Sequence, residues 1–296
     1  MSNLLPSTQA SDIISYVRSR CRLGSTPPNA IFQTTQMLVA LNDINEWFNY
    51  WPIDHGSCAP WKYSRKEKLY LPKNATTLSV AAVAGDTTLT LTSGSDFDSP
   101  SSDAAGGYVT HSDWIHQFFT YESRSSNTLS GVSTIDIAIA SGEDVHKIYT
   151  LPSDFGRPRI CKVNGQEFKF SDSEASDLPS HGYFFTKYMV STSGYDNFYL
   201  ILPESVTAGT TAKMQYIKRP KIISAGTDKV DAPDGVARWG LIKKFESYCW
   251  FHRGESALAQ EAAAEAENLL RSFSSSQSSE DANPDQGPSF ALDSEI

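Results

Sequence analysis

Residues 236–273 read VARWGLIKKFESYCWFHRGESALAQEAAAEAENLLRSF and predict two helices, over 236–253 and 256–273, joined at Gly254. In the first helix, apolar residues recur every three or four positions, the spacing that places side chains on one helix face. Those residues are Val236, Trp239, Ile242, Phe245 and Cys249. The second helix contains six alanines, which makes it the strongest helix-forming segment of the chain. We expect its buried side to comprise Leu258, Ala262, Leu269 and Phe273.

An amphipathic pair of helices needs a partner to bury its apolar stripes, and the other end of the chain predicts one. Residues 11–22 show helical spacing of apolar side chains. Residues 28–51 predict a second helix, for which Thr26 is a suitable N-cap and Pro27 favours the first turn. Pro52 is expected to end this helix. Its apolar stripe consists of Met37, Leu41, Ile44, Phe48 and Trp51.

Between the two helical pairs, from about Cys58 to Ile223, the helical period gives way to the alternation typical of strands. Residues 77–80 and 88–91 predict a hairpin around Gly85–Asp86, and Asn164–Gly165 is the strongest turn signal. Strands are also expected over 114–121, 133–140, 145–151, 159–163, 167–170, 183–190, 198–202 and 212–217. Two segments rich in Ser, Asp and Gly, 93–107 and 171–179, predict loops.

From Ser274 the composition changes to that of a tail. Residues 274–296 contain seven serines, five acids and no Lys or Arg. Such a segment cannot build a core, so we expect it to be disordered in the free protein. Phe290, Leu292 and Ile296 stand out as apolar residues in an otherwise polar segment, and a partner protein could bury them.

The sequence therefore predicts an α+β fold in which one discontinuous helical-bundle domain is interrupted by a large inserted antiparallel β domain. The expected parts are residues 1–57 (helical), 58–223 (β-rich), 224–273 (helical) and 274–296 (the acidic extension). A chain of 296 residues is long enough for two ordinary domains.

Composition excludes several classes of protein. The net charge of −9 and the pI near 5.2 disfavour a sequence-reading DNA-binding protein, which is usually basic. No apolar stretch approaches the roughly 18 to 20 residues of a membrane span, and the first residues do not resemble a secretory signal. The four cysteines form no CxxC pair, so we expect reduced thiols rather than disulfides or a zinc site.

A search for catalytic motifs finds none. The sequence has no GxSxG, GxxxxGK[ST], GxGxxG or HExxH motif, and His111 and His116 are interpreted as ordinary histidines. The aromatic cluster within residues 183–199 is interpreted as sheet core rather than as a sugar-binding platform. We therefore expect no catalytic residues, no metal ligands and no cofactor.

Two groups of basic residues are candidate contact sites. The first is Lys62, Arg65, Lys66 and Lys68, which could contact a tail protein or DNA phosphate, or could simply be a solvated face. The second, around Arg18, fits the C-terminal turn of a helix, where cations interact well with the helix dipole.

The order of elements resembles the head-to-tail adaptor (connector) proteins of tailed bacteriophages, in particular those of short-tailed phages with a β-rich insertion. The resemblance spans residues 7–273 as an architecture and is strongest at 149–157 and 216–273. The segments that carry it are MLVALNDINEWFNYW (37–51), TTLSVAAVAGDTTLTLTSGSDF (76–97), TLSGVSTIDIAIA (128–140), VHKIYTLPSDFGRPRICKVNG (145–165), YLILPESVTAGTTAKMQYIKRPKII (199–223) and the helical stretch 228–273.

The resemblance implies a structural, non-enzymatic virion protein of the neck, assembled in the host cytoplasm. Its copies would form a ring, usually of twelve, beneath the portal, and double-stranded DNA would pass through the bore without being read. Partners would be the portal protein, a tail nozzle or tail-tube protein and tail fibres. The implied portal contacts are Phe290, Leu292, Asp293, Glu295 and Ile296. Residues expected at subunit interfaces or the bore are Arg18, Met37, Leu41, Phe48, Trp239, Phe245, Glu261 and Glu265.

Two alternatives from other classes remain open at this point. One is a virion enzyme that degrades peptidoglycan or polysaccharide, which would need two carboxylates converging in a cleft. The other is a carbohydrate- or receptor-binding tail component, which would need exposed aromatic side chains.

Overall fold

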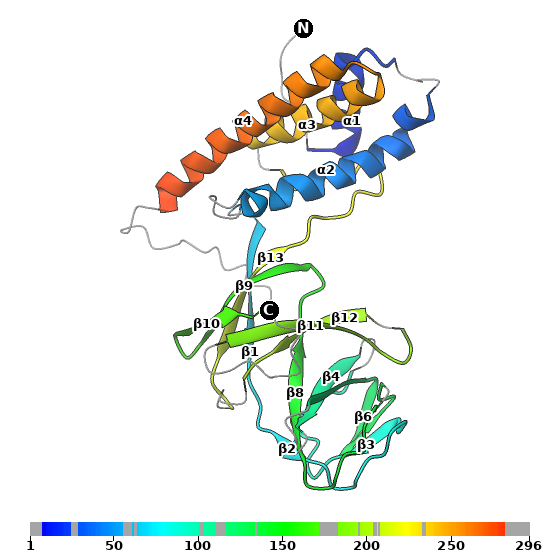
Figure 1. Cartoon of the computed structure of the whole chain (residues 1–296), viewed down its shortest axis with the longest axis vertical. Coiled ribbons are helices and arrows are strands. Elements are labelled where there is room, and N and C mark those ends of the chain that lie inside the picture. The colour runs from blue at the N-terminus through cyan, green and yellow to red at the C-terminus, as the bar shows by residue number, and fades with distance from the viewer. Residues whose placement is uncertain are drawn as a thin grey trace. The chain divides into compact units, whose positions relative to one another are not determined.

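The computed structural model has an α+β fold, as predicted, with helices from both ends of the chain packed together and a large, mostly antiparallel sheet inserted between them (Figure 1). The structure describes residues 8–24, 29–55, 61, 64–100, 104–110, 116–133, 135–171, 183–194, 196–203, 206, 208–232 and 235–281. The chain divides into two compact units, a helical unit (1–65 with 219–296) and a β unit (66–218). This division lies at residues 65 and 219, rather than at 57 and 224, because the segment after residue 218 is bonded to the helices: the Asn42 side chain bonds the backbone of Ile223 in both directions.

The helical unit consists of α1 (Ala10–Arg20), the 3₁₀ helix η1 (Ala30–Phe32), α2 (Thr34–Asp54), α3 (Val236–His252) and α4 (Ser256–Asp281). The expected helix 28–51 begins later than predicted, because Asn29 caps η1 through its side chain and α2 starts only at Thr34. The predicted N-cap at Thr26 lies outside the described residues.

The prediction that Pro52 ends the second helix is wrong, and one hydrogen bond explains why. Pro52 has no N–H to donate to the carbonyl of Phe48, four residues earlier. The indole Nε1–H of Trp61 donates to that carbonyl instead, at 2.7 Å, and α2 continues to Asp54. Trp61 is fully buried and its ring stacks on those of Phe48 and Trp51.

Helices α3 and α4 pack closely along their length. A Cβ atom at Gly240 would lie 2.6 Å from Cδ2 of Leu270, so a larger residue there would force the Leu270 side chain to shift. The expected buried side of α4 is partly wrong: Leu258 is 40 % exposed, whereas Leu270 is fully buried. The buried side of α4 comprises Ala259, Ala262, Ala266 and Leu270, with Phe273 packed at its edge.

The tail begins later than the composition suggests. Residues 274–281 continue α4, and Ser274 is buried, so the boundary expected at residue 274 is corrected to 281. The predicted disorder of the remaining residues, 282–296, lies outside the described part of the chain.

The β unit contains one ten-stranded sheet and one three-stranded sheet. The strands are β1 (Arg65–Tyr70), β2 (Thr76–Thr77), β3 (Thr88–Thr90), β4 (Ala105–Thr110), β5 (His116–Tyr121), β6 (Ser123–Ser125), β7 (Thr128–Ser130), β8 (Asp144–Thr150), β9 (Phe155–Val163), β10 (Gln166–Phe170), β11 (Tyr183–Val190), β12 (Asp196–Ile201) and β13 (Ala212–Lys218). The large sheet has the order β1-β13-β9-β10-β11-β12-β8-β4-β5, with β2 paired to β8, and the small one has the order β3-β7-β6. Among the described strand pairs whose register is defined, all are antiparallel except β10 with β11.

Most strand predictions are confirmed, and the failures have local causes. Asn164–Gly165 forms the predicted turn between β9 and β10, with both residues at positive φ. Residues 105–107, expected to belong to the loop 93–107, instead begin β4, where Gly106 and Gly107 allow a close approach: a Cβ on either would lie within 2.7 Å of a neighbouring side chain. The expected hairpin of 77–80 with 88–91 is reduced to an isolated bridge, because β3 pairs with β7 instead. The described residues of the expected strand 133–140 form only one isolated bridge, between Ile139 and Ala82.

Substitution of Leu270 tests the packing of α4 against its neighbours. We expect Leu270→Ala to lower the free energy of unfolding by about 2–5 kcal/mol, because it removes a fully buried side chain and leaves a cavity beside Gly240. The matched control is Leu258→Ala on the exposed side of the same helix, which should change stability by about 0.5 kcal/mol or less. Denaturant unfolding measures both, and equal losses would contradict this assignment of the faces.

Candidate functional site

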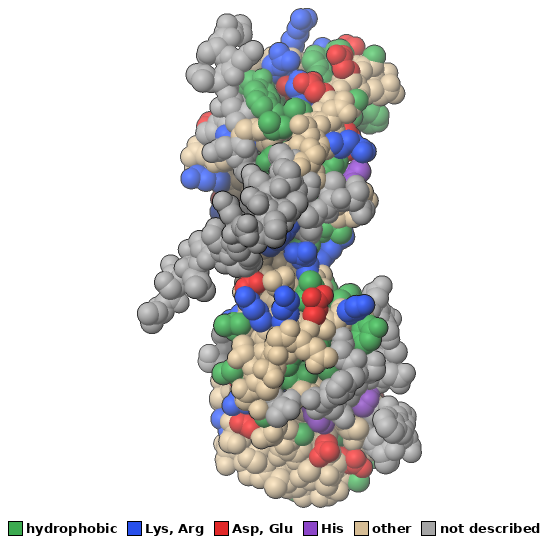
Figure 2. Space-filling view, turned by 90° about the vertical axis from the view of Figure 1, so that its left-hand side faces the viewer, with side chains coloured by type: hydrophobic (Ala, Val, Ile, Leu, Met, Phe, Trp, Pro, Cys, Tyr) green, Lys and Arg blue, Asp and Glu red, His purple; other side chains and the backbone are tan. Residues whose placement is uncertain are grey.

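Four neighbouring strands of the large sheet concentrate positive charge. Strands β1, β13, β9 and β10 are adjacent in the sheet order and together carry nine Lys or Arg and two acids, a net charge of 9 − 2 = +7 in a chain of net charge −9. The basic residues are Arg65, Lys66, Lys68, Arg157, Arg159, Lys162, Lys169, Lys213 and Lys218. Figure 2 shows Lys and Arg side chains gathered over the end of the β unit where these strands lie. We call these four strands the basic half-sheet.

The register of the strands arranges charges in a row across one face of the basic half-sheet. Lys213 of β13 lies opposite Lys162 of β9, which lies opposite Glu167 of β10. Like charges directly opposite each other repel. An acid at each end of the row counters this repulsion. Glu167 stands opposite Lys162 at one end, and at the other end a carboxylate oxygen of Glu67 of β1 lies 2.5 Å from Nζ of Lys213. The face therefore keeps an excess of positive charge without leaving the two opposed lysines unbalanced.

The opposite face of the same strands is apolar at its centre, and Lys66 and Lys68 of β1 lie exposed at its border. Cys161, Phe168 and Met214 lie at this centre within a buried cluster, so the charged side chains project from a rigid support. Burial raises the pKa of the Cys161 thiol to about 12, which keeps it protonated and unreactive at neutral pH. This face stabilises the β unit.

Strand β1 lies at one end of the sheet order, and half of its residues are exposed. Lys66 and Lys68 are exposed on one side of it, while Glu67 points to the other side, where it meets Lys213 and the side-chain amide of Gln215. Leu69 is 59 % exposed. Three of the four residues of the predicted basic contact therefore lie on this strand, and Lys62 lies outside the described residues.

The sequence analysis missed the remaining basic residues of the half-sheet. Lys162, Lys169 and Lys213 come from three different strands, and only the sheet register brings them beside β1. Each is a single lysine among apolar neighbours in the sequence, so no run of charge marks it.

Several residues expected at a subunit interface or the bore lie elsewhere in the helical unit. The side chains of Met37, Leu41, Phe48 and Phe245 are fully buried in its core, where they contact other helices of the same chain. Their helical spacing marks the interior, which a second subunit cannot touch. Trp239 is half-buried and packs edge-on against Tyr16 at 5.6 Å between ring centroids.

A charge network whose two central members, Glu246 and Lys243, are mostly buried connects α1, α3 and α4. Glu246 of α3 is 3 % exposed and lies 3.4 Å from Nε of Arg20 and 3.0 Å from Nζ of Lys243. Lys243 also contacts Glu265 of α4 at 3.0 Å. Burial lowers the pKa of Lys243, but hydrogen bonds to Glu265 and Glu246 outweigh it and the net pKa is raised, so Lys243 is charged. Glu265 is therefore paired, whereas Glu261, the other acid expected at the bore, is exposed on α4.

Arg18 has a structural contact. Its Nη2 donates to the carbonyl of Phe32 at 2.6 Å and to Oγ1 of Thr34 at 3.2 Å, which fixes the start of α2 to α1. This contact accounts for its position near the end of α1.

The helical unit exposes several large apolar side chains that its own core does not use. They are Val39, Ile222, Val236, Phe251 and Leu258, of which Phe251 is 66 % and Ile222 77 % exposed. Phe251 lies near the α3–α4 turn, where its ring contacts His252. Clusters of exposed apolar side chains are typical of protein–protein contact surfaces.

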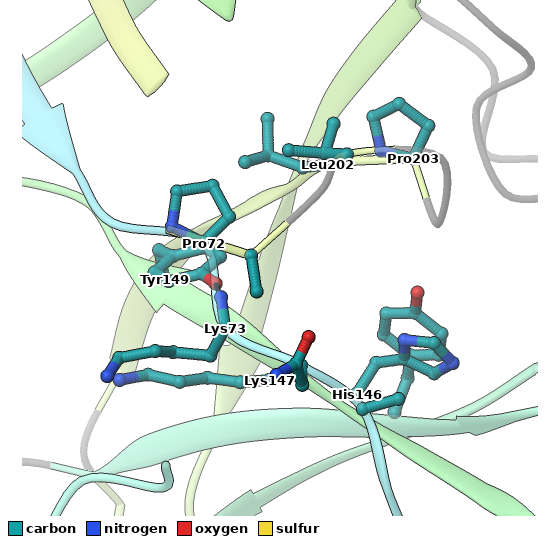
Figure 3. Close-up of a pocket in the computed structure, with 12 residues that line it drawn as sticks. Pro72, Lys73, His146, Lys147, Tyr149, Leu202 and Pro203 are labelled. Atoms are coloured by element: carbon teal, nitrogen blue, oxygen red, sulfur yellow. Dashed lines mark hydrogen bonds between the residues drawn. The ribbon is translucent and has the colours of Figure 1, made fainter. Parts of the chain in front are cut away.

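The β unit also contains a pocket of about 220 Å³ near Lys73, His146, Lys147 and Tyr149 (Figure 3). The lysines are paired with acids, Lys73 with Asp96 at 3.3 Å and Lys147 with Asp98 at 2.7 Å.

Tyr149 is held in place at this pocket and is not poised for acid–base chemistry. Its hydroxyl oxygen accepts the backbone N–H of Lys73 at 2.9 Å, and burial raises its pKa to about 12, so it remains protonated at neutral pH. The pocket is smaller than the roughly 300–1,000 Å³ of usual ligand sites, and we assign it no catalytic role.

Among the residues that the structure describes, no group of three His, Cys, Asp or Glu is placed to hold a metal ion. His116 stacks edge-on against Tyr108, whereas His111 lies outside the described residues. Within the same described part of the chain, no helix has the length and apolar character of a membrane span.

No protein-family model matches the chain, and no curated protein matches its sequence.

The basic half-sheet predicts weak binding of double-stranded DNA that does not depend on sequence. We expect a Kd no tighter than roughly 10⁻⁴ to 10⁻⁶ M near physiological salt, the usual range of non-specific binding. The triple variant Lys66→Ala, Lys68→Ala, Lys162→Ala should bind more weakly and with a smaller salt dependence. Lys73→Ala, whose side chain is paired with Asp96, is the control and should bind as the wild type does. Fluorescence anisotropy at several salt concentrations measures this, and sub-micromolar, sequence-selective binding would contradict it.

Proposed function

We propose that this chain is a structural virion protein of a short-tailed bacteriophage, an adaptor whose copies form a ring between the portal of the head and the tail. In this role twelve copies line the DNA passage, the C-terminal extension binds the portal, and the β unit faces a tail nozzle or tail-tube protein and tail fibres. The protein acts by assembling in the neck of the virion rather than by catalysis.

The observation that carries this proposal is the discontinuous helical unit. Helices α1 and α2 from one end of the chain pack with α3 from the other end, and α3 packs along α4, while the intervening residues form a separate β unit. This is the element order of the adaptor proteins that the sequence resembles. The Glu246 network holds α1, α3 and α4 together, as a ring subunit that transmits load between neighbours requires.

The surfaces of the helical unit support self-assembly. A ring uses one interface between two different patches, repeated until it closes. Exposed apolar side chains are present at both ends of α3, Val236 at its start and Phe251 next to its last residue, and these are the positions that we assign to the two sides of the interface. The core residues expected at this interface are replaced in the proposal by these exposed ones.

The separation of charge supports contacts with different partners. The basic half-sheet suits an acidic protein surface or passing DNA phosphate, and the acidic extension with Phe290, Leu292, Asp293, Glu295 and Ile296 suits a basic crevice of the portal. Glu261 and Glu265 on α4 are placed toward the bore in this proposal, where negative charge would keep DNA from adhering.

Native mass measurement and imaging of the purified particle test the proposed assembly. We expect a twelve-fold ring in the neck; the free protein can remain monomeric until the portal templates it. A single copy per particle with peptidoglycan hydrolysis would favour the enzyme, and a trimer on the tail would favour the receptor-binding component. Either result would overturn the adaptor.

Deletion of residues 282–296 tests the role of the extension. The truncation is made after Asp281 because α4 ends at Asp281 and Ser274, within this helix, is buried. We expect the truncated chain to fold but to join portal-bearing heads at least about tenfold less often, leaving heads that leak DNA, because the anchoring side chains are gone. Joining frequency in complementation measures this. Deletion of Met1–Pro6, at the other end of the chain, is the control, and normal joining after both deletions would contradict the portal contact.

A further inference from the structure

Two buried cysteines from opposite ends of the chain meet in the helical unit. Cys21 directly follows the last residue of α1, and Cys249 lies in α3. Both side chains are fully buried in the same apolar cluster, and both are free thiols. The whole β unit separates them in the sequence, so only the packing of α1 against α3 brings them together.

Contacts with α3 and the residue that follows it position Cys21 beside Cys249. The Sγ of Cys21 lies 3.9 Å from the carbonyl oxygen of Glu246, and Nη1 of Arg253 donates to the carbonyl of Cys21. Glu246 comes one helical turn before Cys249, and Arg253 comes one turn after it. Side chains of a helix lean toward its N-terminus, which carries the Cys249 thiol toward the carbonyl that Cys21 contacts.

The two thiols interact and hold their protons. A hydrogen bond with Cys21, together with burial, raises the pKa of the Cys249 thiol above its ordinary value. A protonated, buried thiol is a poor nucleophile, so the pair reacts slowly while α1 stays packed on α3. Among the described residues, no group of three His, Cys, Asp or Glu is placed to hold a metal ion. The chemistry that the pair offers is therefore oxidation to a disulfide.

We propose that Cys21 and Cys249 form a redox-sensitive latch, which a small external disulfide such as oxidised glutathione closes when the end of α1 opens from α3. The thiolate of one cysteine attacks the external disulfide, which gives a mixed disulfide and releases one thiol. The thiolate of the other cysteine then displaces the second thiol. The two protons and two electrons that the pair loses are taken up by the external disulfide, which becomes two thiols.

Closure of the latch joins the two ends of the helical unit covalently. The resulting loop contains the whole β unit, and a disulfide that closes a long loop restricts the unfolded chain more than one that closes a short loop. In the reduced protein, α1 is held on α3 only by noncovalent contacts such as that of Arg20 with Glu246. The latch stays open in a reducing cytosol and closes in an oxidising medium.

This inference does not rest on the adaptor proposal, because it concerns the packing of two helices within one chain. A monomer and a ring subunit would carry the same latch.

Treatment of the folded, full-length protein with oxidised glutathione tests the latch. We expect peptide mapping without reduction to find Cys21 linked to Cys249 as the principal disulfide, and dithiothreitol to reverse the link. Cys161 is the internal control, because it is equally buried but belongs to the β unit, and it should form no disulfide with either cysteine. The variant Cys58→Ser, mapped beside the wild type, removes the cysteine that lies outside the described residues.

The rate of closure tests whether opening of α1 controls the reaction. Arg20→Ala removes the ion pair with Glu246 and should speed formation of the link by about twofold or more, as expected for the loss of one partly exposed ion pair. Lys73→Ala is the matched control, because it removes an exposed ion pair with Asp96 in the β unit, and it should leave the rate unchanged.

Hydrogen–deuterium exchange measures what the latch does to α1. Amides of α1 should exchange at least about tenfold more slowly in the oxidised protein than in the reduced one, because a disulfide removes openings that separate the two helices. The double variant Cys21→Ala, Cys249→Ala should show no such difference. The proposal is overturned if both cysteines stay unlinked or carry only glutathione, if all cysteine pairs form in equal amounts, or if the link forms without slowing the exchange of α1.

Discussion

The hydrogen bond from the Trp61 indole to the Phe48 carbonyl is the contact on which the helical unit depends most. It supplies a donor to a carbonyl to which Pro52, having no N–H, cannot donate. A buried carbonyl without a donor would lower the stability of the fold. The same indole ring stacks on Phe48 and Trp51 of α2 and packs against Phe273 of α4. One side chain therefore completes a helix from the first part of the chain and joins it to a helix from the last part.

The order of the strands in the large sheet, rather than any run of basic residues in the sequence, concentrates positive charge in this protein. The chain as a whole is acidic, yet the sheet order places four strands of net charge +7 side by side. Acidic partners on both sides of the Lys162–Lys213 pair, Glu167 and Glu67, make this concentration compatible with a stable sheet. A surface with a sign opposite to that of the whole protein is suited to specific contacts, because it attracts acidic partners while the rest of the molecule repels them.

Helical periodicity predicted the helices and the strand alternation predicted most strands, because both report local burial. The sequence could not indicate that Trp61, nine residues beyond Pro52, replaces a missing backbone donor. It also could not separate Leu258 from Leu270, since both fit an apolar helix face and only the contact with Gly240 decides between them. Strand β4 was missed because Gly106 and Gly107 resemble loop residues when their close neighbours are unknown. The basic half-sheet combines residues from four strands, and contacts of that kind are absent from any local pattern.

The insertion of the β unit between α2 and α3 has a consequence for biosynthesis. Helix α2 ends at Asp54 and α3 begins at Val236, so the ribosome adds the 181 intervening residues before α3, which packs against α2, starts to emerge. At about 5–20 residues per second this takes about 10–35 seconds. Until then the side of α2 that packs against α3 has no partner, whereas the strands of the β unit are all synthesised by Lys218. The helices from the two ends of the chain can therefore pack together only after the whole β unit has been synthesised.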